Sequence, residues 1–99
     1  MFTAIYRWQL KPGREEQFID GWQRVTAAIH TACDTYGSRL HKCQDRTWLA
    51  YARWPDAATR DRCEHQEVEG QRLMRESVAR NYEDILGEVV LGMLQEPPT

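Results

Sequence analysis

The hydrophobic period of the chain changes near residue 13, and this change most constrains the fold. From Phe2 to Leu10 the apolar side chains alternate with the others, which is the period of a β-strand. Lys11, Pro12 and Gly13 end the strand, because proline cannot donate to a ladder and glycine accepts turn dihedrals. Over residues 14 to about 34, apolar residues recur at helical spacing. The sequence therefore predicts a sheet with an amphipathic helix packed on it.

A β-hairpin follows the helix. Gly37 is a typical helix end, and two strands are predicted over residues 38–43 and 47–54. A three-residue loop at 44–46 would turn His41 away from the helix, whereas a two-residue loop would bring Arg39 and His41 to the helix side. The sequence leaves this register open.

The second half predicts two helical segments and a last strand. Residues 57–67 form a short charged helix, which Gly70 separates from a second segment with Met74, Val78 and Tyr82 at helical spacing. Residues 85–95 are apolar on both faces, which predicts a strand covered on both sides. Residues 96–99 are expected to be a flexible tail.

This order predicts one α+β domain over residues 1–99, a ferredoxin-like βαββαβ fold with a four-stranded antiparallel sheet and helices on one face. The other face has no helix left to cover it, so we expect a homodimer joined through the sheet faces. Arg7 and Arg53 on that face would pair with an acid such as Glu88 of the second copy, or bind an anion.

Composition narrows the classes of partner. The net charge is −2, with 13 basic and 15 acidic residues, which gives no basic surface for nucleic acid. No apolar run is long enough for a membrane helix and no signal peptide is expected. Cys33, Cys43 and Cys63 lack metal spacing and are expected to be reduced thiols of a cytoplasmic protein. The three histidines are far apart, so no metal site is expected.

The third strand alternates large and small side chains on one side. Alanines between tryptophans leave space where a core strand would fill it, and the first strand offers a similar face. Such a surface would bind a flat aromatic molecule. The alternative is that the helix sits closer and the aromatics fill the core. The residues expected to line the pocket are Tyr6, Trp8, Trp22, Trp48, Ala50, Ala52 and Trp54.

Two polar residues are candidates for chemistry. His65 is the best candidate base because imidazole titrates near neutral pH, although it is equally a surface residue on a charged helix. The Tyr6 hydroxyl would bind a substrate oxygen, or else reach a backbone carbonyl as a core tyrosine does.

The stretches YRWQLKPG, REEQFIDGWQRVT, GSRLH and WLAYARWP resemble the antibiotic-biosynthesis monooxygenase family over nearly the whole chain. The resemblance implies a dimeric α+β barrel. It also implies oxygenation of aromatic phenols or quinols without flavin, haem or metal, the substrate supplying electrons to O₂, with Trp54 at the position of a pocket tryptophan. Where that type has a polar asparagine and a tyrosine, this chain has Ala50 and Arg60.

The leading hypothesis is therefore a cofactor-independent oxygenase of a small aromatic, with Tyr6 and Trp54 positioning the substrate and His65 as base. One alternative is a small-molecule binder or sensor on the same scaffold. The other is a structural interaction domain with a filled core.

Overall fold

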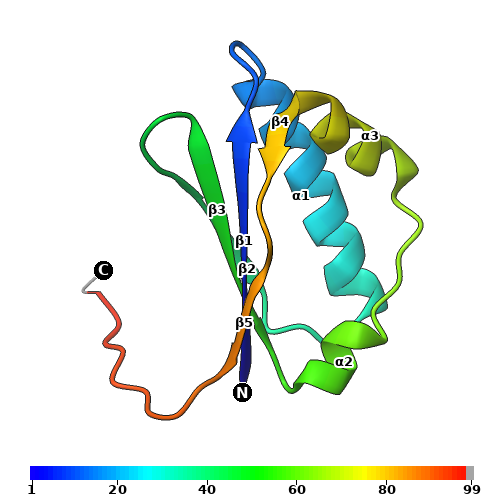
Figure 1. Cartoon of the computed structure of the whole chain (residues 1–99). Helices are drawn as coiled ribbons and strands as arrows, with labels where there is room; N and C mark the ends of the chain where they lie inside the picture. Colours follow the sequence, from blue (N-terminus) through cyan, green and yellow to red (C-terminus); the bar gives the residue numbers. More distant parts are fainter. Residues whose placement is uncertain (98–99) are drawn as a thin grey trace.

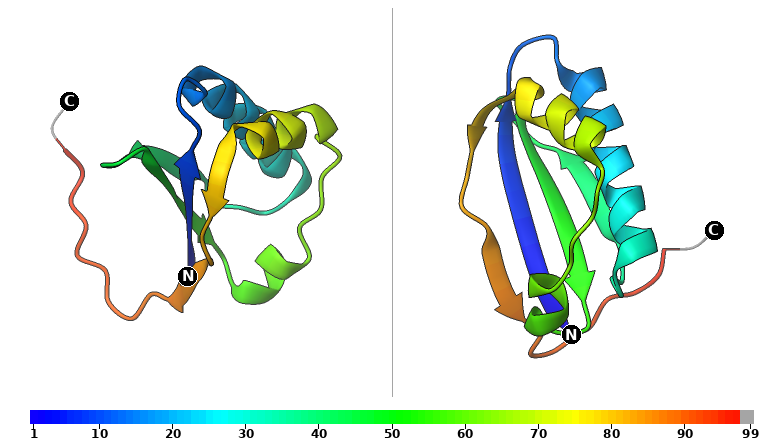
Figure 2. Two further views of the ribbon diagram at one scale, coloured as in Figure 1. Left: turned by 45° about the horizontal axis from the view of Figure 1, so that its top comes forward. Right: turned by 90° about the vertical axis from the view of Figure 1, so that its right-hand side faces the viewer.

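The computed structural model describes residues 1–97 (Figure 1). The elements are β1 (Phe2–Leu10), α1 (Glu15–Ala32), β2 (Ser38–Lys42), β3 (Thr47–Trp54), α2 (Ala57–Asp61), α3 (Val68–Ser77), β4 (Val78–Asn81) and β5 (Ile85–Glu88). The strands form one antiparallel sheet in the order β2-β3-β1-β4, with β5 also paired to β1. Helices α1 and α3 lie on one face of this sheet (Figure 2). The fold is α+β and ferredoxin-like, as predicted.

The central pair of strands has the predicted facing. In the β1–β3 register, Ala4 lies opposite Ala52 and Trp8 opposite Trp48. Residues directly opposite on antiparallel strands share one face, so these alanines and tryptophans form a common surface under the helices.

The hairpin register, which the sequence left open, is set by a three-residue loop. Asp45 and Arg46 adopt positive φ angles of 56° and 59°, and His41 pairs with Leu49 in β3. Leu49 lies on the sheet face without helices, because it alternates with the buried Trp48 and Ala50. His41 and Arg39 therefore lie on the open face and not in the helix-covered one.

Helices α1 and α3 cross at two glycines. A Cβ on Gly21 would lie 2.8 Å from the Gly70 carbonyl oxygen and 2.9 Å from the Leu73 Cβ. A Cβ on Gly70 would lie 2.9 Å from a Val25 methyl. The absence of a side chain at Gly21 thus permits the close approach of the two helices. Gly70 does not break a helix, because it lies inside α3 and lets α1 approach.

The predicted helices and last strand of the second half are wrong in extent. Helix α2 ends at Asp61 and residues 62–67 are irregular, while α3 ends at Ser77, so Val78 and Tyr82 are not helical. The sheet position beside β1 is filled by two short strands laid end to end, β4 against residues 8–10 and β5 against residues 2–5. The sheet therefore has five strands and not the predicted four, because two short strands share one edge of β1.

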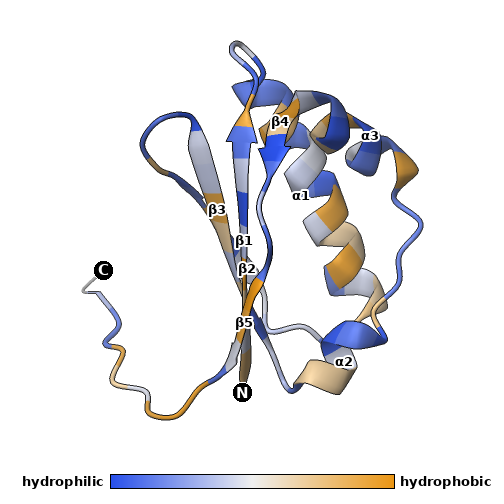
Figure 3. Cartoon of the chain, in the orientation of Figure 1, coloured by the Kyte–Doolittle hydropathy of each residue, from blue (hydrophilic) through white to orange (hydrophobic). Residues whose placement is uncertain are grey.

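The apolar segment at residues 85–95 is not a continuous strand buried on both sides. Strand β5 ends at Glu88, and residues 89–97 continue without helix or strand (Figures 1 and 3). Val90 is 95% exposed and Leu94 is 87% exposed. The predicted tail begins in this segment, and residues 98 and 99 lie outside the described part.

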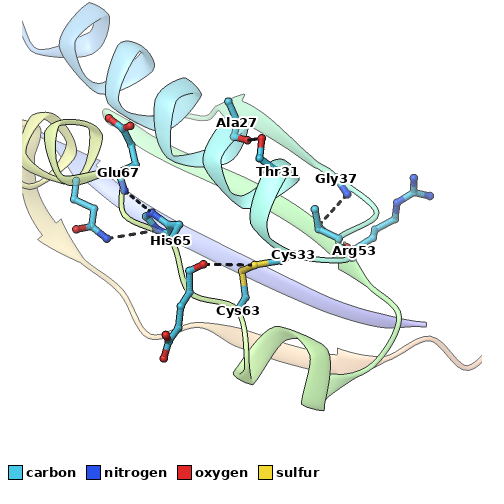
Figure 4. Close-up of a disulfide and its surroundings, with 11 residues drawn as sticks. Ala27, Thr31, Cys33, Gly37, Arg53, Cys63, His65 and Glu67 are labelled. Atoms are coloured by element: carbon cyan, nitrogen blue, oxygen red, sulfur yellow. Dashed lines mark hydrogen bonds between the residues drawn. A yellow bond between two sulfur atoms is a disulfide. The ribbon is translucent and has the colours of Figure 1, made fainter.

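Two of the three cysteines form a disulfide, contrary to the expected reduced thiols. Cys33 follows the end of α1 and Cys63 follows α2, with their Cα atoms 5.6 Å apart (Figure 4). Cys43 is a free, exposed thiol. The pair is 30 residues apart in sequence, so only the tertiary fold brings it together. The cytoplasmic location inferred from reduced thiols stays a prediction.

Within residues 1–97, no helix combines the length and the apolar character needed to cross a membrane.

Candidate functional site

A cavity of about 190 Å³ lies between α1 and the helix-covered face of the sheet. Ala52 contributes to its sheet side, Ile29 and Val25 of α1 face it, and Met74 of α3 closes it further. The predicted pocket residues that line it are Tyr6, Trp8, Trp22, Ala52 and Trp54. Its lining is mostly apolar and aromatic, which suits the face of a flat ring.

Two predicted pocket residues lie outside this cavity. Trp48 is 6% exposed and packs with Leu10 and Phe18, whose ring meets the indole edge-on at 5.9 Å. Ala50 is buried and does not line the cavity. Trp48 instead borders a separate open hollow with Ile19 and Leu40, whereas the cavity lies between Ala52, Trp54 and the end of α1.

Trp54 lines the cavity and has a buried indole N–H without a partner among the described residues. The residue is 4% exposed. A buried donor left without an acceptor costs about 1–3 kcal/mol.

Tyr6 is held by an arginine from α2. Arg60 Nε donates to the Tyr6 hydroxyl at 2.9 Å, and the guanidinium lies 5.5 Å from the centre of the Tyr6 ring. A second nitrogen of Arg60 donates to Asp84 Oδ2 at 2.9 Å. The alternative in which the Tyr6 hydroxyl reaches a backbone carbonyl is not observed.

The charge of Arg60 is stabilised by these partners. Partial burial disfavours the guanidinium cation, but the hydrogen bond to Tyr6 and the nearby Asp84 outweigh it and raise the pKa of Arg60. Helix α2, which positions Arg60, begins at Asp56, whose carboxylate accepts from the Thr59 backbone N–H at 2.7 Å. This hydrogen bond lowers the pKa of Asp56 below its ordinary value.

His65 lies in a neighbouring groove, not in the cavity. The groove is lined by His65, Gln71 and Arg75 and shares Trp8 and Met74 with the cavity. The His65 Nδ1 accepts from the Glu67 backbone N–H at 3.2 Å, and Nε2 lies 3.5 Å from the Gln71 side-chain nitrogen (Figure 4). No hydrogen bond joins His65 to Tyr6 or Trp54 in the described part of the chain.

Sequence reasoning missed Arg60 as a partner of Tyr6. The two residues are 54 positions apart, and Arg60 belongs to a charged segment that is typical of a solvated helix. In the structure the Arg60 side chain is 19% exposed, whereas that of the next residue, Asp61, is 71% exposed. The sequence carries no signal of this difference. Residues 1–97 contain no group of three or more His, Cys, Asp or Glu side chains placed to hold a metal ion.

The fold is that of antibiotic biosynthesis monooxygenase structures. SnoaB, a cofactor-independent oxygenase from Streptomyces nogalater, is 15% identical with a TM-score of 0.78, covering 95% of this chain and 97% of SnoaB. A structure described as an antibiotic biosynthesis monooxygenase is 16% identical with a TM-score of 0.76, covering 92% and 100%.

A protein of unknown function from Nitrosomonas europaea is 15% identical with a TM-score of 0.73, covering 97% of this chain and 95% of its own. No protein-family model and no curated protein sequence matches the chain. At 15–16% identity, the structural similarity establishes the fold and does not establish the activity.

Proposed function

We propose that the protein is a cofactor-independent monooxygenase acting on a small phenol or quinol in the cavity between α1 and the sheet. The observation that carries this proposal is an aromatic-lined cavity bordered by two hydroxyl- or indole-bearing residues, Tyr6 and Trp54. Since a cavity of about 150 Å³ holds one benzene ring, about 190 Å³ suits one or two rings.

The chemistry needs little from the protein beyond this environment. An ionised phenol passes one electron to O₂, and the phenoxyl radical and superoxide combine into a peroxide. Loss of water then leaves a quinone, so that one phenol and one O₂ give one quinone and one water. A dry cavity and donors that hold the phenol oxygen favour this sequence.

A small-molecule binder or sensor is the second candidate. It is favoured by the position of His65, which lies in the adjoining groove and forms its hydrogen bonds with Glu67 and Gln71. A binder needs the cavity and its donors but no base beside the reacting carbon.

Oxygen uptake separates the two functions. One- and two-ring phenols and quinols are screened for O₂ consumption and for thermal stabilisation of the protein. An oxygenase consumes O₂ and transfers one atom of labelled O₂ to the product. A binder is thermally stabilised by the compounds but consumes no O₂. If the protein shows neither O₂ consumption nor thermal stabilisation, both functions are ruled out.

We also propose that two copies pack through their open sheet faces to form a dimeric α+β barrel. Arg7 lies on this face, and its Nε is buried without a partner among residues 1–97. The exposed apolar tail borders the same face, since Leu94 lines a hollow together with Tyr51 and Arg53. A second copy would cover these groups.

A further inference from the structure

We propose that Arg60, held by Asp84, is a positioning residue that makes Tyr6 a hydrogen-bond donor selecting the phenolate form of the ligand. This inference rests on the proposed function, because it names the chemical state of the ligand in the same cavity. The observation behind it is the chain of contacts from Asp84 through Arg60 to Tyr6.

The hydrogen-bond roles follow from the groups themselves. A guanidinium can only donate, so the Tyr6 oxygen accepts from Arg60 and keeps its own proton for another partner. Among residues 1–97 the one side-chain hydrogen bond of this hydroxyl is the one that it accepts from Arg60. Tyr6 lines the cavity, so a ligand oxygen there can accept the proton of the hydroxyl.

The arrangement strengthens the hydroxyl as a donor. A cation that donates to the Tyr6 oxygen polarises the O–H bond, and hydrogen bonds linked in this way reinforce one another. Arg60 is only 19% exposed, so water screens its charge less than it would on an open surface. The carboxylate of Asp84, 2.9 Å away, fixes the guanidinium in place.

A polarised donor discriminates between forms of the ligand. A phenolate oxygen is a charged acceptor, and its hydrogen bonds are about twice as strong as those of a neutral oxygen. The aromatic walls contact a neutral ring and an ionised ring alike. The ionised phenol, which is the form that gives an electron to O₂, is therefore the one that Tyr6 and Arg60 favour.

The test uses 2-naphthol, whose absorbance distinguishes the naphthol from the naphtholate, and naphthalene as the matched ring without oxygen. The whole chain is titrated with pH in the presence of saturating 2-naphthol. We expect the bound naphthol to ionise about one pH unit lower than the free compound, a tenfold preference for the naphtholate. Arg60→Gln and Tyr6→Phe should abolish this preference, and Arg60→Lys should restore part of it.

Arg62→Gln is the control, because Arg62 follows the same short helix, is exposed and donates its side-chain hydrogen bond to Thr59. It should leave the ionisation unchanged, and naphthalene affinity should be the same in every variant. Should Arg60→Gln fail to fold, Tyr6→Phe, which removes the hydroxyl and keeps the ring, tests the same preference.

The outcomes separate the two proposals. If naphthalene and 2-naphthol bind but the naphthol ionises equally in the parent and Arg60→Gln, this inference is overturned while the cavity remains a binding site. If neither compound binds, the proposed function and this inference are both overturned. Loss of the preference in Arg60→Gln with naphthalene binding intact supports both.

Discussion

Trp48 and Trp54 stand in the same strand and face the same helices, yet their surroundings differ. Both are buried and both have an indole N–H without a partner in residues 1–97. Phe18 and Leu10 pack against Trp48, whereas Trp54 borders the cavity. Trp54 therefore contacts the cavity, whereas Trp48 does not.

This pair allows a matched substitution. Trp54→Phe and Trp48→Phe each replace a buried indole with a smaller phenyl ring. Both should destabilise the fold similarly, on the order of 1–2 kcal/mol. Of the two, only Trp54 lines the cavity, so Trp54→Phe should weaken 2-naphthol binding about threefold to tenfold through lost aromatic contact. Calorimetric titration of both variants measures this. Equal loss of affinity in the two variants would contradict the placement of the site.

At the scale of elements, the crossing of α1 and α3 sets the width of the cavity. Gly21 and Gly70 bring the helices close enough for Val25 and Met74 to reach the cavity from the two helices. A Cβ added to Gly21 would lie 2.8 Å from the Gly70 carbonyl oxygen, which is a backbone atom and not the end of a flexible side chain. The contact cannot relax by a rotamer change.

Gly21→Ala is therefore expected to destabilise the protein. Alanine gains about 1 kcal/mol of helix propensity, but overpacking costs roughly 1–3 kcal/mol, and the fixed backbone contact places the cost at the upper end. Urea unfolding measures the net loss of about 1–2 kcal/mol. Gly87→Ala is the control, because no atom lies within 4 Å of its added Cβ. A more stable Gly21→Ala variant would refute the close crossing.

The disulfide joins α1 to the irregular segment after α2, which carries His65. Closing a loop of 30 residues stabilises the fold by about 3–4 kcal/mol on the chain-entropy account. The Cys33→Ser, Cys63→Ser double variant should lose this amount in urea unfolding and become insensitive to reductant. Cys43→Ser should behave like the parent, because Cys43 is free and exposed. A parent protein that reductant does not destabilise would argue against the pairing.

The elements that the sequence predicted well are those with a strong single period. The alternation of β1 and the stripe of α1 both correspond to observed elements. The strand at 85–95 was predicted from apolarity alone, and apolarity does not tell a paired strand from an exposed segment. The site was accessible in part: Trp54 stood out by its pattern, but Arg60 and the Cys33–Cys63 bond depend on contacts between distant residues.

At the scale of the whole molecule, the open sheet face and the exposed tail call for a partner. Leu49→Arg on the open face should convert a dimer to a monomer, because a charge would be buried against the second copy. Val68→Arg is the control, since Val68 is 71% exposed on α3, away from that face. Sedimentation equilibrium measures the mass. A parent protein with the mass of one chain would rule out the barrel.

The most direct test of the account is a two-dimensional ¹H–¹⁵N spectrum of the labelled protein during titration with 2-naphthol. The chain has four tryptophans, so four indole N–H signals are expected, which Trp→Phe variants assign. We predict that the Trp54 indole signal shifts strongly on binding, because Trp54 lines the cavity, while that of Trp48, packed against Phe18, stays in place. Binding of 2-naphthol with an unmoved Trp54 signal would contradict the central claim that this cavity is the functional site.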